Sequence, residues 1–197
     1  MPLDRIESYV GSDDVVIMCG LPLTGKSTVA KLVSASRRMP VVSTDLVRRD
    51  VLGGEDIFDE QVASDMNKRV MVYHETLRRA NDALRTGGGV LIDATFVTQS
   101  LRREAAKLAE EHRRRLAILE TRCERSVSLA RLRRRSREQY ESNAMTEQAY
   151  YNNEVLFEPV ALDALKQSTP NLDMVHLMID TQNDSSQEWY IESVEKA

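Results

Sequence analysis

Short apolar runs alternate with longer amphipathic segments along this chain of 197 residues. Five runs have the length and composition of buried strands: 15–19, 39–43, 90–93, 116–120 and 174–180. The segments between them carry apolar residues three and four positions apart, which is typical of helices with one buried face. Strands that alternate with helices predict an α/β fold, a parallel sheet of about five strands with helices on both faces.

The helical segments can be placed with approximate ends. After a lead-in with one helical turn (1–12), we predict helices at about 28–36, from 44 to the Gly53-Gly54 pair, and at 59–85, 98–111, 124–137, 148–166 and 185–195. Pro159 must start, kink or break the helix that contains it. The polar segment 137–149 has no clear period and is predicted to be mobile, so residues 124–150 together form a candidate lid. We expect one domain over residues 1–197, since a chain of this length is short for two.

One segment fits the phosphate-loop pattern G-x-x-x-x-G-K-[ST] at every fixed position. It consists of Gly20, Leu21, Pro22, Leu23, Thr24, Gly25, Lys26, Ser27 and Thr28. The segment lies between the first predicted strand and the first helix, where backbone N–H groups and a helix N-terminus can bind phosphate. We therefore predict a nucleoside triphosphate site, with Lys26 on the β- and γ-phosphates and Ser27 as a Mg²⁺ ligand. Thr28 has two interpretations, an N–H near the α-phosphate or ordinary helix-start chemistry.

Two aspartates follow other predicted strands, at the edge where ligands bind in such sheets. Asp93 ends the strand at 90–93 and is a candidate Mg²⁺ ligand, directly or through water. Thr95 is close enough in sequence to assist. Asp45 follows the second strand and could accept the proton of an attacking hydroxyl. For both aspartates a helix cap is the alternative, and Thr44 is a second candidate cap.

Arginines supply the remaining candidates. Between 122 and 137 the chain has seven arginines and one acid, which favours an anion site. Arg131 and Arg135 are four apart and share one helix face, where they could neutralise transferring phosphates. A solvated arginine face is the alternative. Arg48, three residues after Asp45, could bind an anionic acceptor.

The composition argues against some classes of protein and site but does not indicate a specific function. The formal net charge is −4 and aromatic residues make up 5%, both of which argue weakly against a nucleic-acid surface. No apolar run is long enough to cross a bilayer and the N-terminus has no signal-peptide pattern, so we expect a cytoplasmic protein without membrane contact. Two cysteines, Cys19 and Cys123, make no disulfide framework, and no His/Cys group has zinc spacing.

The ordered set of motifs resembles the phosphate-loop kinases related to the kinase domain of polynucleotide 5′-kinase, a group that includes zeta-toxin-like ATPases. The similarity covers roughly residues 15–165. Its residues are the phosphate loop, Ser43-Thr44-Asp45 with Arg48, Leu91-Ile92-Asp93-Ala94-Thr95-Phe96 with Arg102-Arg103, Arg131-Leu132 with Arg135, and Phe157-Glu158-Pro159. One departure is Leu23-Thr24, where that group usually has Gly-Ser.

The resemblance implies a three-layer phosphate-loop NTPase fold with a helical lid. It also implies that Asp45 is the general base, that Arg48 contacts the acceptor's phosphate, and that Arg131 and Arg135 clamp the donor phosphates. We therefore predict an ATP- and Mg²⁺-dependent kinase acting on a hydroxyl, first of all a polynucleotide 5′-OH. The alternatives are a small-molecule kinase for a sugar, nucleoside or antibiotic, and a nucleotide-binding switch without phosphotransfer. If the protein is a kinase of either kind, Asp45, Arg48 and Thr95 are the residues expected to contact the acceptor.

Overall fold

A computed structural model describes residues 1–53, 65–134 and 146–197 of the chain. Within these residues one six-stranded sheet has the order β2-β3-β1-β4-β5-β6. The strands are β1 (Val15–Cys19), β2 (Val41–Ser43), β3 (Val90–Asp93), β4 (Leu116–Arg122), β5 (Met174–Asp180) and β6 (Tyr190–Lys196). β1 to β5 pair in parallel, and β6 pairs with β5 antiparallel. The predicted α/β fold is confirmed, with one more strand than expected.

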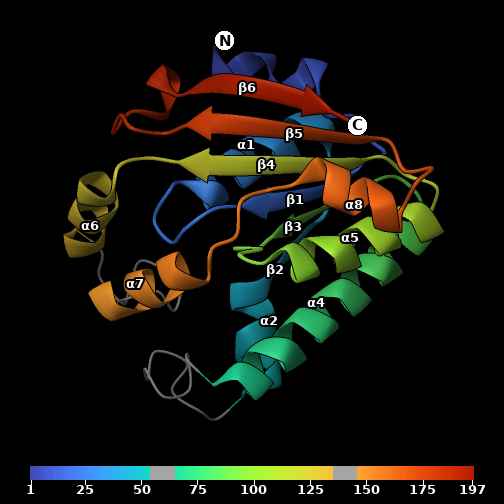
Figure 1. Cartoon of the computed structure of the whole chain (residues 1–197), viewed down its shortest axis with the longest axis horizontal. Coiled ribbons are helices and arrows are strands. Elements are labelled where there is room, and N and C mark those ends of the chain that lie inside the picture. The colour runs from blue at the N-terminus through green and yellow to red at the C-terminus, as the bar shows by residue number, and fades with distance from the viewer. Residues whose placement is uncertain (54–64, 135–145) are drawn as a thin grey trace.

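Helices cover both faces of the sheet (Figure 1). One face packs on α4 (Met66–Arg85), α5 (Gln99–Glu111) and α8 (Leu162–Ser168), and the other on α1 (Lys26–Arg37) and the 3₁₀ segment η1 (Leu3–Ser8). Alternation along β1 explains both cores, because Val15, Ile17 and Cys19 face the first layer while Val16 and Met18 face the second. The result is a three-layer structure.

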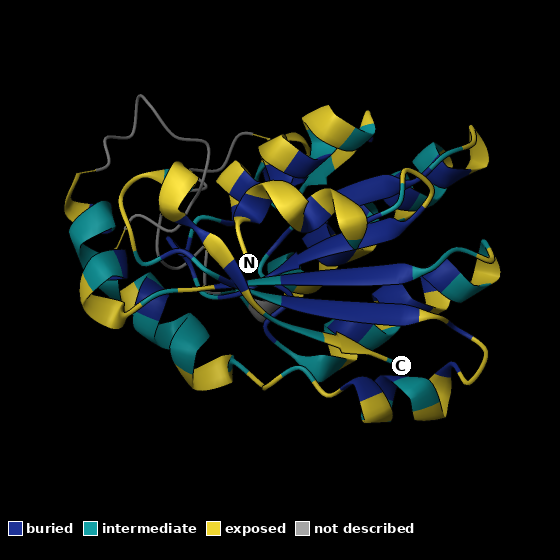
Figure 2. Cartoon of the chain, turned by 90° about the horizontal axis from the view of Figure 1, so that it is seen from above, coloured by how far each residue is buried: buried dark blue, intermediate teal, exposed yellow. Residues whose placement is uncertain are grey.

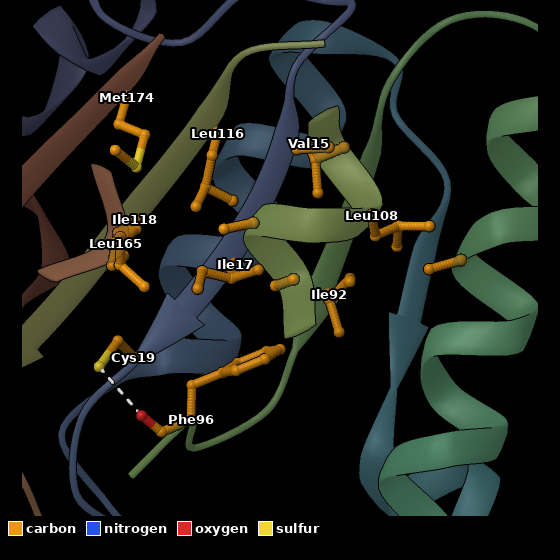
Figure 3. Close-up of a cluster of buried hydrophobic side chains, with 14 of the residues drawn as sticks. Val15, Ile17, Cys19, Ile92, Phe96, Leu108, Leu116, Ile118, Leu165 and Met174 are labelled. Atoms are coloured by element: carbon orange, nitrogen blue, oxygen red, sulfur yellow. Dashed lines mark hydrogen bonds between the residues drawn. The ribbon is translucent and has the colours of Figure 1, made fainter. Parts of the chain in front are cut away.

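The strands carry the buried surface and the helices expose their outer faces (Figure 2). In the larger core, Ile17, Ile92 and Ile118 of three adjacent strands meet Leu108 of α5 and Leu165 of α8 (Figure 3). All three isoleucines are fully buried, so both faces of the central strands are covered, as expected for a parallel sheet.

The strand order reverses at β1, which has β3 on one side and β4 on the other. Such a point leaves a crevice outside the carboxyl ends of the strands, where doubly wound proteins bind ligands. Figure 1 shows α2 (Thr44–Val51), α6 (Arg125–Arg133) and α7 (Glu147–Leu156) at this end of the sheet. The candidate site residues that the structure describes belong to α2 and α6, to the end of β3 and the residues after it, and to the loop after β1 with the first turn of α1.

The predicted C-terminal helix at 185–195 is wrong. A short 3₁₀ turn, η2 (Ser186–Glu188), leads instead into β6. Ile191 and Val194, two apolar residues of this strand, are three apart, and a register shift in the pairing with β5 sets Ile179 opposite Ile191 and Met178 opposite Ser193. This irregularity interrupts the simple alternation that marks a strand in a sequence.

Other predicted boundaries shift for local reasons. The segment 148–166 forms two helices, α7 and α8, because residues 157–161 around Pro159 leave the helical conformation. The helix predicted at 59–85 is described from Met66 onward, and its earlier part lies outside the described residues, as does most of the polar segment 137–149. No helix among residues 1–53, 65–134 and 146–197 is long and apolar enough to span a membrane.

Candidate active site

The phosphate loop joins β1 to α1 and depends on two glycines. Gly20 has a φ of 129° and Gly25 one of 86°, a region that favours glycine. A Cβ on Gly20 would lie 2.4 Å from the Thr121 carbonyl oxygen, and one on Gly25 would lie 2.6 Å from the Trp189 ring. Close approach therefore excludes a side chain at both ends of the loop.

A threonine cluster from two strand ends supports the back of the loop. The Thr24 hydroxyl donates to the Leu21 carbonyl (2.8 Å) and accepts from the Thr121 hydroxyl (2.7 Å). The Thr181 hydroxyl donates to the Thr24 carbonyl (2.8 Å). All three hydroxyl-bearing side chains are buried, so these bonds fix the loop without competition from water. The Lys26 ammonium donates to the Leu21 carbonyl (2.6 Å), which holds it over the loop.

Leu23 stands where the resembled group has glycine, and its backbone takes the glycine conformation. Its φ is 69°, in the left-handed region that costs an L-residue roughly 1–2 kcal/mol. The side chain is buried, and the carbonyl accepts from Arg131 Nη1 (3.3 Å). Burial of the side chain and fixation of the carbonyl offset the strain.

The predicted Mg²⁺ ligands lie together. The Ser27 side chain, in the first turn of α1, lies close enough to the carboxylate of Asp93, the last residue of β3, to influence its pKa. Burial raises the pKa of Asp93, while the Ser27 hydroxyl and the charges of Lys26 and Lys31 act in the opposite direction. A hydroxyl and a carboxylate are hard oxygen donors of the kind that suit Mg²⁺ when phosphate and water complete its coordination. The described residues contain no cluster of three or more His, Cys, Asp or Glu side chains that could hold a metal ion.

Asp45 lies in the first turn of α2, directly beyond the strand next to β3. Ser43 pairs in register with Asp93, so the backbone places Asp45 two residues past the partner of the metal-side acid. Ser43 itself is the N-cap and makes no side-chain cap hydrogen bond, so the predicted caps, Thr44 and Asp45, are wrong. The Thr44 hydroxyl instead donates to the Asp93 carbonyl (3.3 Å). The N-cap position therefore belongs to Ser43, and Asp45 lies within the first turn of the helix.

Arg48 is one turn further along α2 and is only 7% exposed. Its Nε and Nη1 have no hydrogen-bond partner among the described residues. Burial lowers the pKa of Arg48, and the charge of Asp45 partly opposes that effect. A buried guanidinium without full hydrogen bonding is costly, so it needs an explanation.

Thr95 is positioned by Tyr73 of α4. The two hydroxyls lie 3.1 Å apart, and the Phe96 N–H donates to the Tyr73 oxygen (3.1 Å). The Thr95 carbonyl accepts from the Gly20 N–H (3.1 Å). Thr95 therefore links the acceptor side of the site to the start of the phosphate loop, and burial raises the pKa of Tyr73 so that its hydroxyl stays protonated.

Arg131 and Arg135 are the predicted phosphate clamp. The structure describes Arg131, whereas Arg135 lies outside the described residues. Arg131 Nη2 donates to the carbonyls of Thr181 (2.5 Å) and Asn183 (2.8 Å). Its guanidinium also stacks on the ring of Trp189, 5.6 Å from the centroid, and the Trp189 N–H donates to the Asn183 carbonyl (2.7 Å). In this structure Arg131 ties α6 to the loop after β5 and to Leu23.

Within the described part of the basic segment, most arginines pair with acids from other parts of the chain. Four of its arginines form exposed ion pairs: Arg122 with Glu192, Arg125 with Glu154, Arg133 with Glu147, and Arg134 with Asp184. Such pairs contribute little to stability, but they remove the uncompensated positive charge that the local sequence indicated.

A hollow of about 360 Å³ lies between α6 and the loop after β5. Val127 and Ala130 contribute apolar wall, while Gln182 and Asn183 contribute polar groups. One helical turn separates Val127 from Arg131, which contacts the phosphate loop through Leu23. The hollow is therefore adjacent to the predicted triphosphate site.

Comparison with known proteins identifies the family. The model of an AAA domain family, designated AAA_33, matches residues 15–159, which include the phosphate loop, Asp45, Asp93 and α6. The chain belongs to this family. An uncharacterized protein of Mycobacterium bovis and two of Mycobacterium tuberculosis are each 36% identical to this AAA domain over 121 residues. The match covers 58% of this chain and 24% of each mycobacterial protein, so the chain spans about a quarter of their length.

Two solved structures that are similar to this AAA domain are described as kinases. A gluconokinase from Sinorhizobium meliloti superposes with a TM-score of 0.61 at 15% identity, covering 88% of this chain and 86% of that one. A sugar kinase from Janibacter gives 0.59 at 14% identity, covering 84% and 85%. At such identities the likeness establishes the phosphate-loop kinase fold, and the acceptor must be argued from the site. The specific resemblance to polynucleotide 5′-kinase stays a prediction.

Several contributors to the site were missed in the sequence. Thr121 and Thr181 come at the ends of β4 and β5, at the same edge as the phosphate loop, and that position was a usable signal. Tyr73 falls within the helix predicted at 59–85, and no sequence pattern connects its hydroxyl with Thr95. Trp189 lay in the segment wrongly predicted as helix, so nothing in the sequence linked it to Gly25.

Proposed function

We propose that this domain is an ATP- and Mg²⁺-dependent kinase that phosphorylates a hydroxyl group of a small-molecule acceptor, such as a sugar or a nucleoside. The observation that carries the proposal is the approach of the Ser27 side chain to the Asp93 carboxylate at a complete phosphate loop, with Asp45 just beyond the end of the adjoining strand. A generic nucleotide switch needs the first pair, whereas an acid on the acceptor side serves a kinase.

The residues divide the reaction between them. The acceptor oxygen attacks the γ-phosphorus, the bond from that phosphorus to the bridging oxygen of ADP breaks, and the hydroxyl proton passes to the Asp45 carboxylate. Lys26 and the backbone N–H groups of the loop bind the donor phosphates. Ser27 and Asp93 would hold Mg²⁺, which supplies charge neutralisation at the phosphates. The hollow beside Val127 would take the nucleobase.

The acceptor is proposed to be small because several arginines of the basic segment are already paired with acids. A polynucleotide groove needs arginines available to the phosphate backbone and aromatic side chains for stacking. Here Arg125, Arg133 and Arg134 each have an acidic partner, and the chain has 5% aromatic residues. The sugar kinases of similar fold are compatible with this choice.

The test is transfer from γ-labelled ATP to sugars, sugar acids, nucleosides and 5′-OH oligonucleotides. We expect the label to be transferred to one or more small acceptors and not to the oligonucleotides. Asp45→Asn should lower kcat about 10²- to 10⁴-fold with the KM for ATP unchanged, as for loss of a general base. Asp50→Asn is the matched control, since Asp50 is an exposed acid on the same helix that pairs with Arg79, and it should stay within about twofold of wild type.

Nucleotide binding can be followed separately through Trp189, the single tryptophan of the chain. Its ring packs on Gly25, so its fluorescence should change on ATP binding and the response should be lost in Lys26→Ala. A normal fluorescence response with no transfer to any acceptor would indicate a nucleotide-binding switch instead. Labelling of oligonucleotides alone would restore the polynucleotide acceptor.

A further inference from the structure

Phe96, the residue after Thr95, adopts a strained backbone conformation beside the candidate site. Its φ is 41°, in the left-handed region that a bulky L-residue rarely occupies. The Phe96 side chain is fully buried, so an exposed turn does not explain this conformation. Strain of this kind persists only where the surrounding structure fixes it, and it is concentrated at functional sites. We therefore ask which neighbouring group the conformation of Phe96 positions.

Four contacts fix the backbone around Thr95. The Phe96 N–H donates to the Tyr73 hydroxyl oxygen (3.1 Å), and the two rings meet edge to face with their centroids 5.6 Å apart. The Cys19 thiol donates to the Phe96 carbonyl (3.6 Å; Figure 3). On the other side, the Thr95 carbonyl accepts from the Gly20 N–H (3.1 Å). The backbone that carries the Thr95 side chain is thus held by α4, by β1 and by the phosphate loop.

The Tyr73 hydroxyl also sets the direction of a hydrogen bond. It lies 3.1 Å from the Thr95 hydroxyl, and by distance alone either oxygen could be the donor. The Tyr73 oxygen already accepts from the Phe96 N–H, and within the described residues its proton has no acceptor other than Thr95. If Thr95 donated instead, the proton of a buried phenol would be left unpaired, which is unfavourable. Tyr73 therefore donates, and the Thr95 hydroxyl keeps its own proton for a different acceptor.

The position of Thr95 identifies that acceptor. Thr95 is partly exposed and lies two residues beyond Asp93, after the end of a strand that pairs with β1. Its carbonyl contacts the first residue of the phosphate loop, so Thr95 connects the loop with the predicted Mg²⁺ side of the site. The γ-phosphoryl group of a bound triphosphate is held by both of these parts. Its charged oxygens are strong acceptors for a hydroxyl proton.

We propose that Tyr73 is a positioning residue, which holds Thr95 as a hydrogen-bond donor to the γ-phosphoryl group of ATP. The inference rests on the proposed function, because this is the group that the kinase transfers, and it assigns Thr95 to the nucleotide rather than to the hydroxy acceptor. A donor that is fixed before the reaction stabilises charge on the transferring group without reorganisation. The strain at Phe96 has a function in this arrangement, because it fixes the backbone that carries the Thr95 hydroxyl.

Binding of ATP and of ADP, each with Mg²⁺, tests the donor without any acceptor. The fluorescence of Trp189 reports both affinities, and urea unfolding verifies that each variant is folded. Thr95→Val should weaken ATP about 10- to 100-fold, the range for a hydrogen bond to a charged group, and leave ADP within about twofold. Thr95→Ser keeps a hydroxyl and should retain most of the affinity for ATP. An equal loss of affinity for ATP and ADP in Thr95→Val would refute the contact with the γ-phosphoryl group.

Tyr73→Phe tests the positioning role, because it removes the hydroxyl and leaves the ring. It should weaken ATP about 2- to 10-fold, the range for a neutral hydrogen bond, with ADP unchanged. In a Thr95→Val background it should have no further effect, since the two hydroxyls act as one unit. Tyr150→Phe, at a buried tyrosine of α7, is the matched control and should leave both affinities unchanged. The same loss from Tyr73→Phe in both backgrounds would refute the proposal, because Tyr73 would then act independently of Thr95.

Transfer assays separate this inference from the proposed function. A reduced preference for ATP over ADP in Tyr73→Phe and Thr95→Val, with no transfer to any acceptor, would retain the role of Tyr73 and refute the kinase. Efficient transfer, with kcat and nucleotide preference unchanged in both variants, would refute this inference and retain the kinase. A rise in the KM for the hydroxy acceptor alone in Thr95→Val would place Thr95 on the acceptor, and would also refute it.

Discussion

The left-handed conformation of Leu23 makes a prediction that can be measured without knowing the substrate. Leu23 has a φ of 69°, so replacement by alanine should leave the backbone strain in place, whereas glycine should relieve it. Both substitutions remove the same buried side chain, at a cost of about 2–5 kcal/mol. The difference between the two variants therefore isolates the backbone.

The magnitude follows from two opposing effects. Relief of left-handed strain favours glycine by roughly 1–2 kcal/mol. The extra freedom of glycine in the unfolded chain opposes it by about 0.5–1 kcal/mol. Leu23→Gly should therefore be at least as stable as Leu23→Ala, with an advantage of up to about 1.5 kcal/mol, the reverse of the usual order in a helix.

Leu32 provides the matched control, since it is a leucine in the regular part of α1. There alanine should be more stable than glycine by about 1 kcal/mol. Urea unfolding of the four variants gives both differences, and their sum measures the strain at the phosphate loop. If Leu23→Gly were less stable than Leu23→Ala by the amount found at Leu32, the loop would not adopt this conformation in solution.

Three other substitutions or treatments probe the buried polar groups. Asp93→Asn should stabilise the ligand-free protein at neutral pH. Burial raises the pKa of Asp93 above its ordinary value of 3.8. The stability of the wild type therefore falls as the pH rises from 3.8 through the pKa of the folded state, and asparagine avoids this loss. Urea titrations against pH would show the gain vanish near pH 3.8, and a pH-independent difference would contradict the reasoning. Arg102→Met should cost about 2–4 kcal/mol of unfolding free energy, because Arg102 is fully buried and donates to the carbonyls of Val97, Glu158 and Pro159; a loss under about 0.5 kcal/mol would contradict this. A thiol reagent should label Cys123 in the native protein but not Cys19, which is fully buried and whose pKa burial raises to about 11; mass spectrometry would locate the label, and native labelling of Cys19 would refute the buried environment.

The parts of the site that sequence reasoning anticipated are those specified by local pattern. The phosphate loop is contiguous, and its neighbours Asp45 and Asp93 each follow a short apolar strand. Parallel pairing brings such strand ends to one edge, and the register of Ser43 with Asp93 realises this. The positions of these residues in the sequence were therefore sufficient to predict that they lie close together at one edge of the sheet.

The features that the sequence did not predict depend on contacts between segments that are distant in the chain. The arginines of α6 looked like a free anion site, but Glu147, Glu154 and Asp184 neutralise three of them from positions that no local pattern connects to α6. The last strand was hidden by a register shift in its pairing with β5. Arg48 could not be distinguished from a surface arginine in the sequence. Only its burial, and the lack of hydrogen-bond partners for its Nε and Nη1 among the described residues, set it apart in the structure.

Residues beyond the family match complete the phosphate loop of this chain. The match ends at residue 159, yet the Thr181 hydroxyl holds the Thr24 carbonyl and the Trp189 ring covers Gly25. Arg131, inside the match, binds the carbonyls of Thr181 and Asn183 on one side and of Leu23 on the other. The strained leucine is thus fixed by contacts that the C-terminal segment supplies. A loop that departs from the glycine-rich pattern requires this support, because its own backbone no longer relaxes into the phosphate-binding conformation without strain.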